Sequence, residues 1–374
     1  MNLNDVKIFS FFSGAGFLDL GFETSGYNIA FVNEYSTAFL NAYRYSRRNM
    51  GINEPTYGYF NGDIGELLTK RQDEFDSMIN EQRNNGNVIG FIGGPPCPDF
   101  SVGGKNRGKN GDNGKLSATY VNVICHGKPD FFLFENVKGL WRTKSHREYF
   151  DELKRILHAN GYLTTERLIN SIEYGAPQDR ERIILMGFGH NFLRSLGHTI
   201  VEGQLEVKDF PWANGIRYDR EVVFSNPWPT IEPFNENLPT LCPDNIPEEL
   251  TVEFWFSRNQ VYNHPNANDF FQPRQGLVKM QTIGEGDDKK KSYKRLHRWR
   301  YSPTAAYGNN EVHLHPYKAR RISVAEALAI QSLPANFILP SDMTLSDKFK
   351  TVGNGVPYLA AKGLADAIKT FLEG

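Results

Sequence analysis

The sequence predicts an α/β protein with a Rossmann-like, mostly parallel sheet covered by helices on both faces, together with a smaller and irregular second domain. Short apolar runs alternate with helical patterns over the first 190 residues, which is typical of βα units. Prolines and tryptophans interrupt any regular pattern over 190–318, and helical patterns return after it. We therefore expect one domain made of 1–189 and 319–374, and a second domain of 190–318.

The predicted strands are apolar on both faces, as buried parallel strands tend to be. They are Val6–Phe11, Ile29–Asn33, Val88–Gly93, Phe131–Phe134 and Arg182–Gly187. Helical patterns cover Thr37–Arg47 and Tyr149–Ala159, and Asn160-Gly161 ends the second of them. Near the C-terminus, Ser323 and Glu326 form a capping box that begins a helix ended by Pro334. Pro357 fits the first turn of a last helix that runs to Phe371.

Composition excludes several classes of protein. The chain of 374 residues is longer than one core usually organises. Its 42 Lys and Arg against 43 Asp and Glu give a net charge of -1, so a polyanion must be held by local basic patches. Three cysteines cannot build a disulfide framework, and neither a signal-like N-terminus nor an apolar run of 18 residues is found. We expect a cytoplasmic protein with no membrane partner and no metal.

A glycine turn follows the first predicted strand and precedes a helical pattern. It contains Phe12, Gly14, Ala15 and Gly16, and such a turn lets a ligand approach the backbone. The third glycine of the dinucleotide fingerprint is absent. Glu34, at the end of the next strand, could accept hydrogen bonds from ribose hydroxyls. Asp63 could accept one from an adenine amino group, although either carboxylate could equally cap a helix.

Cys97 follows two prolines directly after the Val88–Gly93 strand. Pro95 and Pro96 hold it on a stiff loop at the carboxyl edge of the sheet, where α/β enzymes place their chemistry. The glycines and cations of 102–111 are typical of a loop that closes over a polyanion. A nucleophilic thiol and a buried inert thiol are the two alternatives.

Further charged residues stand at strand ends. Glu135 terminates a wholly apolar strand, so its carboxylate should bond to backbone groups or face a ligand. Arg180 and Arg182 fall on one face of an extended segment, and the alternative is that they form surface ion pairs. In the second domain, 289–300 holds seven Lys or Arg in twelve residues with Tyr and Trp between them. That run fits either a solvated face or a nucleic-acid surface.

Taken in order, these motifs closely resemble the cytosine-C5 DNA methyltransferase family, and in particular its prokaryotic modification enzymes. The resemblance covers 6–189 and 320–372. The motifs that carry it are Phe12–Gly16, Glu34, Asp63, Pro95-Pro96-Cys97, Glu135-Asn136-Val137, Gln178 with Arg180 and Arg182, Arg321–Pro334 and Thr351–Pro357.

The resemblance implies a sheet that binds S-adenosylmethionine and a covalent mechanism on duplex DNA. Cys97 would add to C6 of a flipped-out cytosine, which makes C5 reactive towards the methyl group. Glu135 would hold the N3/N4 edge, Arg182 the O2 side, and Arg180 would brace the closed catalytic loop. The base that removes the C5 proton is not identified. Cofactor contacts are implied for Phe12, Gly14, Ala15, Gly16, Glu34, Asp63, Ile64, Pro96, Asn354 and Val356.

The second domain would read the DNA sequence in the major groove and contact phosphates. DNA contacts are implied for Ser101, Lys105, Arg107, Gln178, Lys294, Arg295 and Arg298. We expect a monomer that acts on double-stranded DNA, with a companion restriction endonuclease acting separately.

Three departures from the family pattern stand out. Phe17 replaces a frequent glycine, and Pro98-Asp99 replaces the common Gln-Gly or Gln-Ala after the cysteine. Gly355 replaces a frequent serine, a change that we expect to be silent.

Three other functions fit parts of the pattern. An RNA cytosine-C5 methyltransferase would share the chemistry, but the Cys-Phe-Thr tripeptide and small variable domain of that branch are not found. A catalytically inactive DNA-binding homologue should lack Cys97, Glu135 or Arg182, and all three are present. A nicotinamide-dependent dehydrogenase is suggested by the glycine turn alone.

Overall fold

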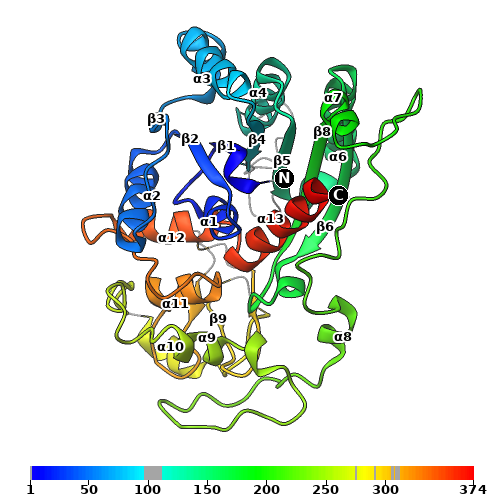
Figure 1. Ribbon diagram of the computed structural model, residues 1–374. Helices are drawn as coiled ribbons and strands as arrows, with labels where there is room; N and C mark the ends of the chain where they lie inside the picture. The colour runs from blue at the N-terminus through cyan, green and yellow to red at the C-terminus, as the bar shows by residue number, and fades with distance from the viewer. Residues whose placement is uncertain (1, 97–111, 274–275, 290–291, 305–306, 308–311) are drawn as a thin grey trace.

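The computed structural model describes residues 2–96, 112–273, 276–289, 292–304, 307 and 312–374. Its centre is a seven-stranded sheet in the order β3-β2-β1-β4-β5-β8-β6 (Figure 1). Neighbouring strands from β3 to β5 pair in parallel, whereas β8 is antiparallel to both β5 and β6. The strands are β1 Val6–Phe11, β2 Asn28–Glu34, β3 Tyr59–Asn61, β4 Val88–Gly93, β5 Phe131–Val137, β6 Tyr162–Asn170 and β8 Glu181–Gly189.

Helices cover both faces of this sheet, which confirms the predicted fold class. One apolar core joins the sheet to α1 and α13, and a second joins it to α3, α4 and α6 on the other face. Figure 1 shows α13 lying across the sheet beside α1. The helices here are α1 Phe17–Thr24, α2 Thr37–Met50, α3 Gln72–Asn84, α4 Asp112–Gly127, α5 Lys138–Arg142, α6 Lys144–Ala159, α7 His190–Ser195 and α13 Tyr358–Glu373, with 3-10 turns Leu3–Asp5, Ile64–Leu68 and Ser171–Tyr174.

The rest of the chain forms an irregular lobe with short elements. These are α8 Arg220–Ser225, α9 Val252–Arg258, α10 Leu277–Thr282, α11 Val324–Ile330, α12 Leu345–Asn354, a 3-10 turn Glu248–Leu250 and the short strands β7 Gln178–Asp179, β9 Lys294–Arg295, β10 Ser302–Pro303 and β11 His313–Leu314. A third apolar core joins α9, α11 and α12 to Phe17 and Leu20 of α1. The lobe is therefore packed against the helix that follows the glycine turn.

The expected domain boundary at residue 190 falls inside a packed region. Phe192, Leu193, Val207 and Phe210 belong to the same apolar core as the sheet. The capping box of Ser323 and Glu326 is present and begins α11 as predicted. Within the described ranges, no helix combines the length and apolarity that crossing a bilayer requires.

Candidate active site

The glycine turn lies at the carboxyl end of β1, where the topology predicts a ligand site. Gly14 and Gly16 have φ values of 57° and 80°, which favour glycine. A Cβ on Gly16 would lie 2.4 Å from the Tyr43 ring, so no larger side chain fits beneath the turn. Arg47 Nη2 donates a hydrogen bond of 2.6 Å to the Gly16 carbonyl. Phe12 is half-buried and Ala15 is buried against the third core.

Glu34 holds this turn in place. Its Oε2 accepts a hydrogen bond of 2.8 Å from the Gly14 amide, and its Oε1 accepts one of 2.7 Å from Ser36. Burial raises the pKa of Glu34, although the hydrogen bonds from these amides lower it in part. Tyr35, which was not among the predicted site residues, is 75% exposed directly beside Glu34. An aromatic residue following the acidic end of a strand was the signal that could have identified it.

Asp63 is a helix cap, which was one of the two alternatives. Its Oδ1 accepts a hydrogen bond of 2.7 Å from the Gly65 amide at the start of a 3-10 turn, while the side chain stays exposed. The next residue, Ile64, is buried in the second core. Capping leaves the second carboxylate oxygen of Asp63 open to a ligand.

The C-terminal segment reaches the glycine turn from the other side. Asn354 is exposed at the end of α12, and Val356 is buried. A Cβ on Gly14 would lie 3.9 Å from Thr351 Oγ1, so α12 ends next to the turn. The hydroxyls of Ser13 and Thr351 are buried and have no hydrogen-bond partner among the described residues. Such orphaned hydroxyls beside a glycine turn fit a site that binds a polar ligand.

Gly355 packs against Phe17, another residue that departs from the family pattern. A Cβ on Gly355 would lie 2.1 Å from the Phe17 ring. The expectation that replacing serine by glycine here is silent is therefore wrong for this chain. The two departures compensate each other, because the large Phe17 occupies the space that a serine side chain would need.

Glu135 and Arg182 form a buried ion pair at the ends of β5 and β8. The distance between Arg182 Nε and Glu135 Oε1 is 2.9 Å, and the side chains are 13% and 11% exposed. Gly94 lies against the Glu135 carboxylate, since a Cβ at Gly94 would be 2.6 Å from Glu135 Oε2. Burial raises the pKa of Glu135, while Arg182 and Arg180 oppose the shift. The structure thus brings together two of the predicted catalytic residues.

The loop that leads to Cys97 starts beside this pair. Asn136 Nδ2 donates a hydrogen bond of 3.4 Å to the Pro95 carbonyl, and Pro96 is exposed. Cys97 itself lies outside the described residues. The predicted DNA contacts Ser101, Lys105 and Arg107 also fall there.

Arg180 and Gln178 connect the site to the C-terminal helices. Arg180 is buried, its Nη2 donates a hydrogen bond of 2.8 Å to the Gly353 carbonyl, and burial lowers its pKa. Gln178 is fully buried, with its amide nitrogen 3.4 Å from Gln331 Oε1. Gln331 in turn donates to the Val352 carbonyl of α12. In the described structure both residues contact the α11 and α12 segments, and the direct DNA contact of Gln178 stays a prediction.

Two arginines of the basic run lie inside the protein, contrary to the prediction that they contact DNA. Arg298 forms a bidentate ion pair with Glu285 at 2.8 Å, and its guanidinium lies over the ring of Tyr317. Arg295 is fully buried and donates to the backbone carbonyls of Ile283, Met280 and His315. Their donors serve the lobe itself and do not face a phosphate. Lys294 remains half-buried without an ion pair in the described ranges.

A cluster of cations, which was not predicted from the sequence, surrounds Glu181, the residue before Arg182. Glu181 binds Lys138, Arg142 and Arg220 at 2.5, 3.2 and 2.7 Å. Glu181 is 7% exposed, whereas the three cations are 46%, 54% and 33% exposed. Three cations around one carboxylate leave a surplus of positive charge at the surface. No metal-ligand group of three or more His, Cys, Asp or Glu occurs among the described residues.

Comparisons with known proteins identify the family of the chain. The family model described as C-5 cytosine-specific DNA methylase matches residues 6–370. The Type II methyltransferase M.NmeDI of Neisseria meningitidis serogroup C is 59% identical over 367 residues, which cover 98% of this chain and 84% of that protein. The Type II methyltransferase M.NgoPII of Neisseria gonorrhoeae is 29% identical, over 99% of this chain and 97% of that protein.

Solved structures show the same fold at lower identity. A DNA modification methyltransferase from an E. coli prophage superposes with a TM-score of 0.62 at 21% identity, covering 99% of this chain and 100% of that one. A Spodoptera frugiperda DNMT2 mutant superposes with a TM-score of 0.58 at 15% identity, covering 98% and 99%. The match of the family model over nearly the whole chain, with the 59% identical relative, shows that the protein belongs to the C-5 cytosine-specific DNA methylase family and is a DNA cytosine methyltransferase of the Type II kind.

Proposed function

We propose that the protein transfers a methyl group from S-adenosylmethionine to C5 of a cytosine flipped out of a specific duplex DNA sequence. The observation that carries this proposal is the buried pair of Glu135 and Arg182 beside Pro95, which leads to Cys97. A carboxyl group with a raised pKa, held by a guanidinium at the carboxyl edge of the sheet, can recognise the polar edge of a pyrimidine.

The cofactor would be held around the glycine turn. Glu34 and Asp63 each have lone pairs left for a nucleoside, and Tyr35 offers an exposed ring. The unpartnered hydroxyls of Ser13 and Thr351 could bind the polar end of the molecule. When bound, S-adenosylmethionine supplies an electrophilic methyl group. Asn354, at the exposed end of α12, lies on the same side as Thr351.

The chain's own residues would activate the base. The Cys97 thiol loses its proton and its sulfur bonds to C6, which moves electron density to C5. Glu135, whose pKa burial raises against the opposing charges of Arg182 and Arg180, would take up a proton, donate to N3 and stabilise the charge that forms on the ring. Arg182 fixes the Glu135 carboxyl and reaches towards O2. After methylation, a base removes the C5 proton, the bond between sulfur and C6 breaks, and the Cys97 thiolate is restored.

The cations around Glu181 would hold the DNA backbone near this pocket. Lys138, Arg142 and Arg220 are partly exposed and their surplus charge favours phosphate. Flipping a base out of the stack costs a few kcal/mol, which contacts to the flanking phosphates help to offset. Action as a monomer in the cytoplasm, alongside a separate restriction endonuclease, stays a prediction from the family resemblance.

Methylation of a random duplex library with labelled cofactor, followed by bisulfite sequencing, tests the proposal. We expect label at C5 of cytosine within one sequence context, and a library in which no cytosine is labelled would contradict the proposal. Cys97→Ala should abolish transfer. Cys125→Ala is the matched control, because burial raises the pKa of that half-buried thiol to about 11 and makes it unreactive. Duplexes with 5-fluorocytosine at the methylated position should become covalently attached to the protein.

A further inference from the structure

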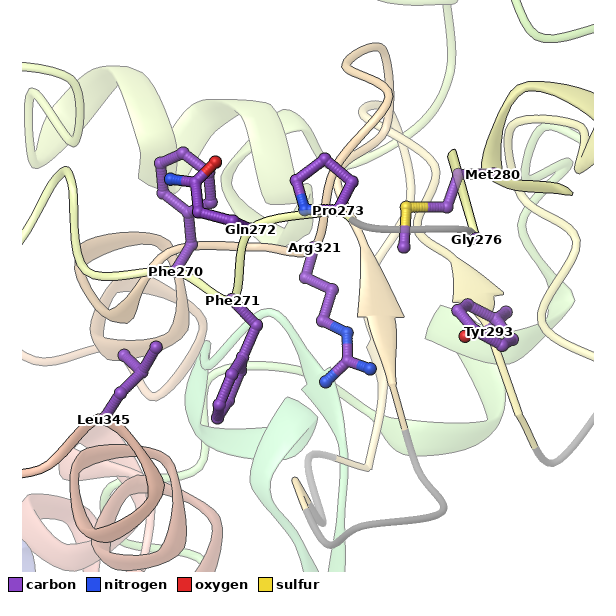
Figure 2. A pocket seen from close by; sticks show the side chains of 9 residues that line it. All are labelled: Phe270, Phe271, Gln272, Pro273, Gly276, Met280, Tyr293, Arg321 and Leu345. Atoms are coloured by element: carbon purple, nitrogen blue, oxygen red, sulfur yellow. The ribbon is translucent and has the colours of Figure 1, made fainter. Parts of the chain in front are cut away.

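A recess in the irregular lobe has features that the methylation reaction as described above does not use. Its volume is about 470 Å³, within the range of small-molecule sites. Phe271, Met280, Tyr293 and Arg321 line it, and Leu345 at the start of α12 closes one side. Figure 2 shows the Arg321 side chain between Phe271 on one side and Met280 and Tyr293 on the other.

The recess combines aromatic faces with positive charge. The Arg321 guanidinium carbon lies 5.2 Å from the centre of the Phe271 ring, and Lys279 Nζ lies 5.0 Å from the centre of the Tyr293 ring. Among the described residues that line the recess, none is acidic. Nor does any described residue form an ion pair or a hydrogen bond with the Arg321 guanidinium, which therefore has all its donors available. These properties match an aromatic anion.

The aromatic wall is fixed and leads towards the catalytic centre. The Phe271 ring stacks on Phe349 of α12 at 5.6 Å, and Phe349 contacts Tyr307 at 5.4 Å. The buried Tyr307 hydroxyl in turn interacts electrostatically with Arg180, which adjoins Arg182 in sequence and influences Glu135. Phe271, Phe349 and Tyr307 thus form a chain of ring contacts that leads from the recess towards Arg180.

We propose that this recess binds one nucleotide of the DNA substrate other than the target cytosine. Its base packs on the Tyr293 ring and against the edge of the Phe271 ring, and Arg321 donates hydrogen bonds to its phosphate. Every base has an aromatic face, and cations next to stacking rings are the common means of holding a single nucleotide. The proposal rests on DNA being the substrate, as in the proposed function, and adds where a second nucleotide is held.

The test measures DNA binding by fluorescence anisotropy with labelled duplexes. The probe is a duplex carrying the methylated sequence from the library, and a single abasic site is moved along it. For the wild-type protein, loss of the base at one position outside the target cytosine should weaken binding by about 5- to 100-fold, the range for stacking one base. Phe271→Leu and Tyr293→Leu should bind the intact duplex more weakly and no longer distinguish it from that abasic duplex.

Arg321→Ala should lower the slope of log affinity against log salt by about one, since one phosphate contact is lost. Arg321→Lys should keep the slope. Arg258→Ala is the matched control, because Arg258 also lies over an aromatic ring of the same lobe, Trp255 at 4.9 Å, but does not line the recess. Thermal melting identifies any variant that fails to fold. If Arg321→Ala does not fold, the salt dependence of DNA affinity is compared between Arg321→Lys and Arg258→Ala instead.

An abasic sensitivity that persists unchanged in folded Phe271→Leu and Tyr293→Leu proteins would overturn the proposal. So would an Arg321→Ala protein that loses affinity for S-adenosylmethionine but not for DNA, or that binds an apolar peptide in place of DNA. Binding and methylation are measured separately. A protein that methylates a base other than cytosine, yet shows the abasic sensitivity on a duplex carrying its methylated sequence, would therefore contradict the proposed function and leave the nucleotide site supported.

Discussion

Among single residues, Glu135 is the one whose chemistry depends most directly on its surroundings. It sits near the end of an apolar strand, where Arg182 forms an ion pair with it at 2.9 Å. Burial raises its pKa despite this cation. The sequence predicted a strand over Phe131–Phe134, which lies within β5, and a carboxylate after four apolar residues indicated that Glu135 needs a partner. It could not predict the partner's position, which depends on the antiparallel register of β5 and β8.

Glu135→Gln should lower the rate of methyl transfer by at least about 100-fold, the contribution typical of a positioned proton donor. DNA affinity should stay near the wild-type value. In the wild-type protein the rate should fall as pH rises through the raised pKa of Glu135, because the protonated carboxyl is the active form. The measurement is single-turnover methylation between pH 5 and 9. Glu66→Gln, at the surface ion pair with Lys70, is the control. If the rate of Glu135→Gln fell at high pH in the same way as that of the wild-type protein, Glu135 would not be the proton donor.

Gly355 and Phe17 make a second prediction at this scale. Gly355→Ser should destabilise the protein by about 1–3 kcal/mol, the usual cost of overpacking, because its Cβ would lie 2.1 Å from the Phe17 ring. It should also weaken cofactor binding, since Phe17 begins the helix after the glycine turn. Urea denaturation and cofactor titration measure the two effects.

The control for this pair is a double-mutant cycle. Phe17→Ala alone leaves a cavity and is itself costly. Adding Gly355→Ser to that variant should cost less than adding it to the wild-type protein, because the obstructing ring is gone. Additive effects would show that the two residues do not share this space.

At the scale of elements, the sequence pattern predicted the features that depend on one segment alone. It did not predict the features that depend on residues far away in the sequence. Val6–Phe11 and Val88–Gly93 match β1 and β4, and the capping box of α11 is as expected, because each signal lies within one segment. The edge strand β6 was not predicted, since its middle is half-buried and carries Glu166 and Arg167. The ion pair of Arg298 with Glu285 was missed because nothing in a run of cations indicates which of them is buried.

Because Arg298 is buried and Lys289 is exposed, we expect their substitutions to have different effects although both lie in the basic run. Arg298→Ala should destabilise the lobe by about 3–5 kcal/mol, because it leaves the buried Glu285 carboxylate without its partner. Lys289→Ala, at an exposed position, should leave stability unchanged and flatten the salt dependence of DNA affinity. Thermal melting and anisotropy titrations at several salt concentrations separate the two effects. An Arg298→Ala protein of wild-type stability with a flattened salt dependence would return Arg298 to the DNA surface.

For the whole molecule, the near-zero net charge means that DNA must be held by local surpluses of cations. The structure offers such a surplus around Glu181 on the catalytic side, and another at Arg321 and Lys279 on the lobe. The two surfaces come from different parts of the chain, so correct assembly of the lobe on the sheet is a condition for binding. Acid should disturb this assembly through the buried histidines of the lobe.

Among the buried histidines of the lobe, His313 has the surroundings that most clearly disfavour protonation. It is buried, neither ring nitrogen has a hydrogen-bond partner in the described structure, and its ring packs against Tyr307 at 5.3 Å. Burial, with Lys294 adding to it, lowers the pKa of His313 from 6.5 to about 3. The folded protein therefore binds this proton less readily than the unfolded chain does. The resulting stability is fully present above pH 6.5 and is lost as pH falls from 6.5 towards 3.

His313→Phe should remove this sensitivity while keeping a ring against Tyr307. Between pH 7.5 and pH 5 the wild-type protein should lose about 2 kcal/mol more of its unfolding free energy than the variant, from 1.4 kcal/mol per pH unit over about 1.5 units. Urea denaturation at the two pH values measures the difference. His126→Phe, on the surface beside Asp76, is the control for an exposed histidine. If His313→Phe lost stability in acid as steeply as the wild-type protein, the proton would bind elsewhere, and His315 and His297, whose pKa values burial also lowers, would be the next positions to change.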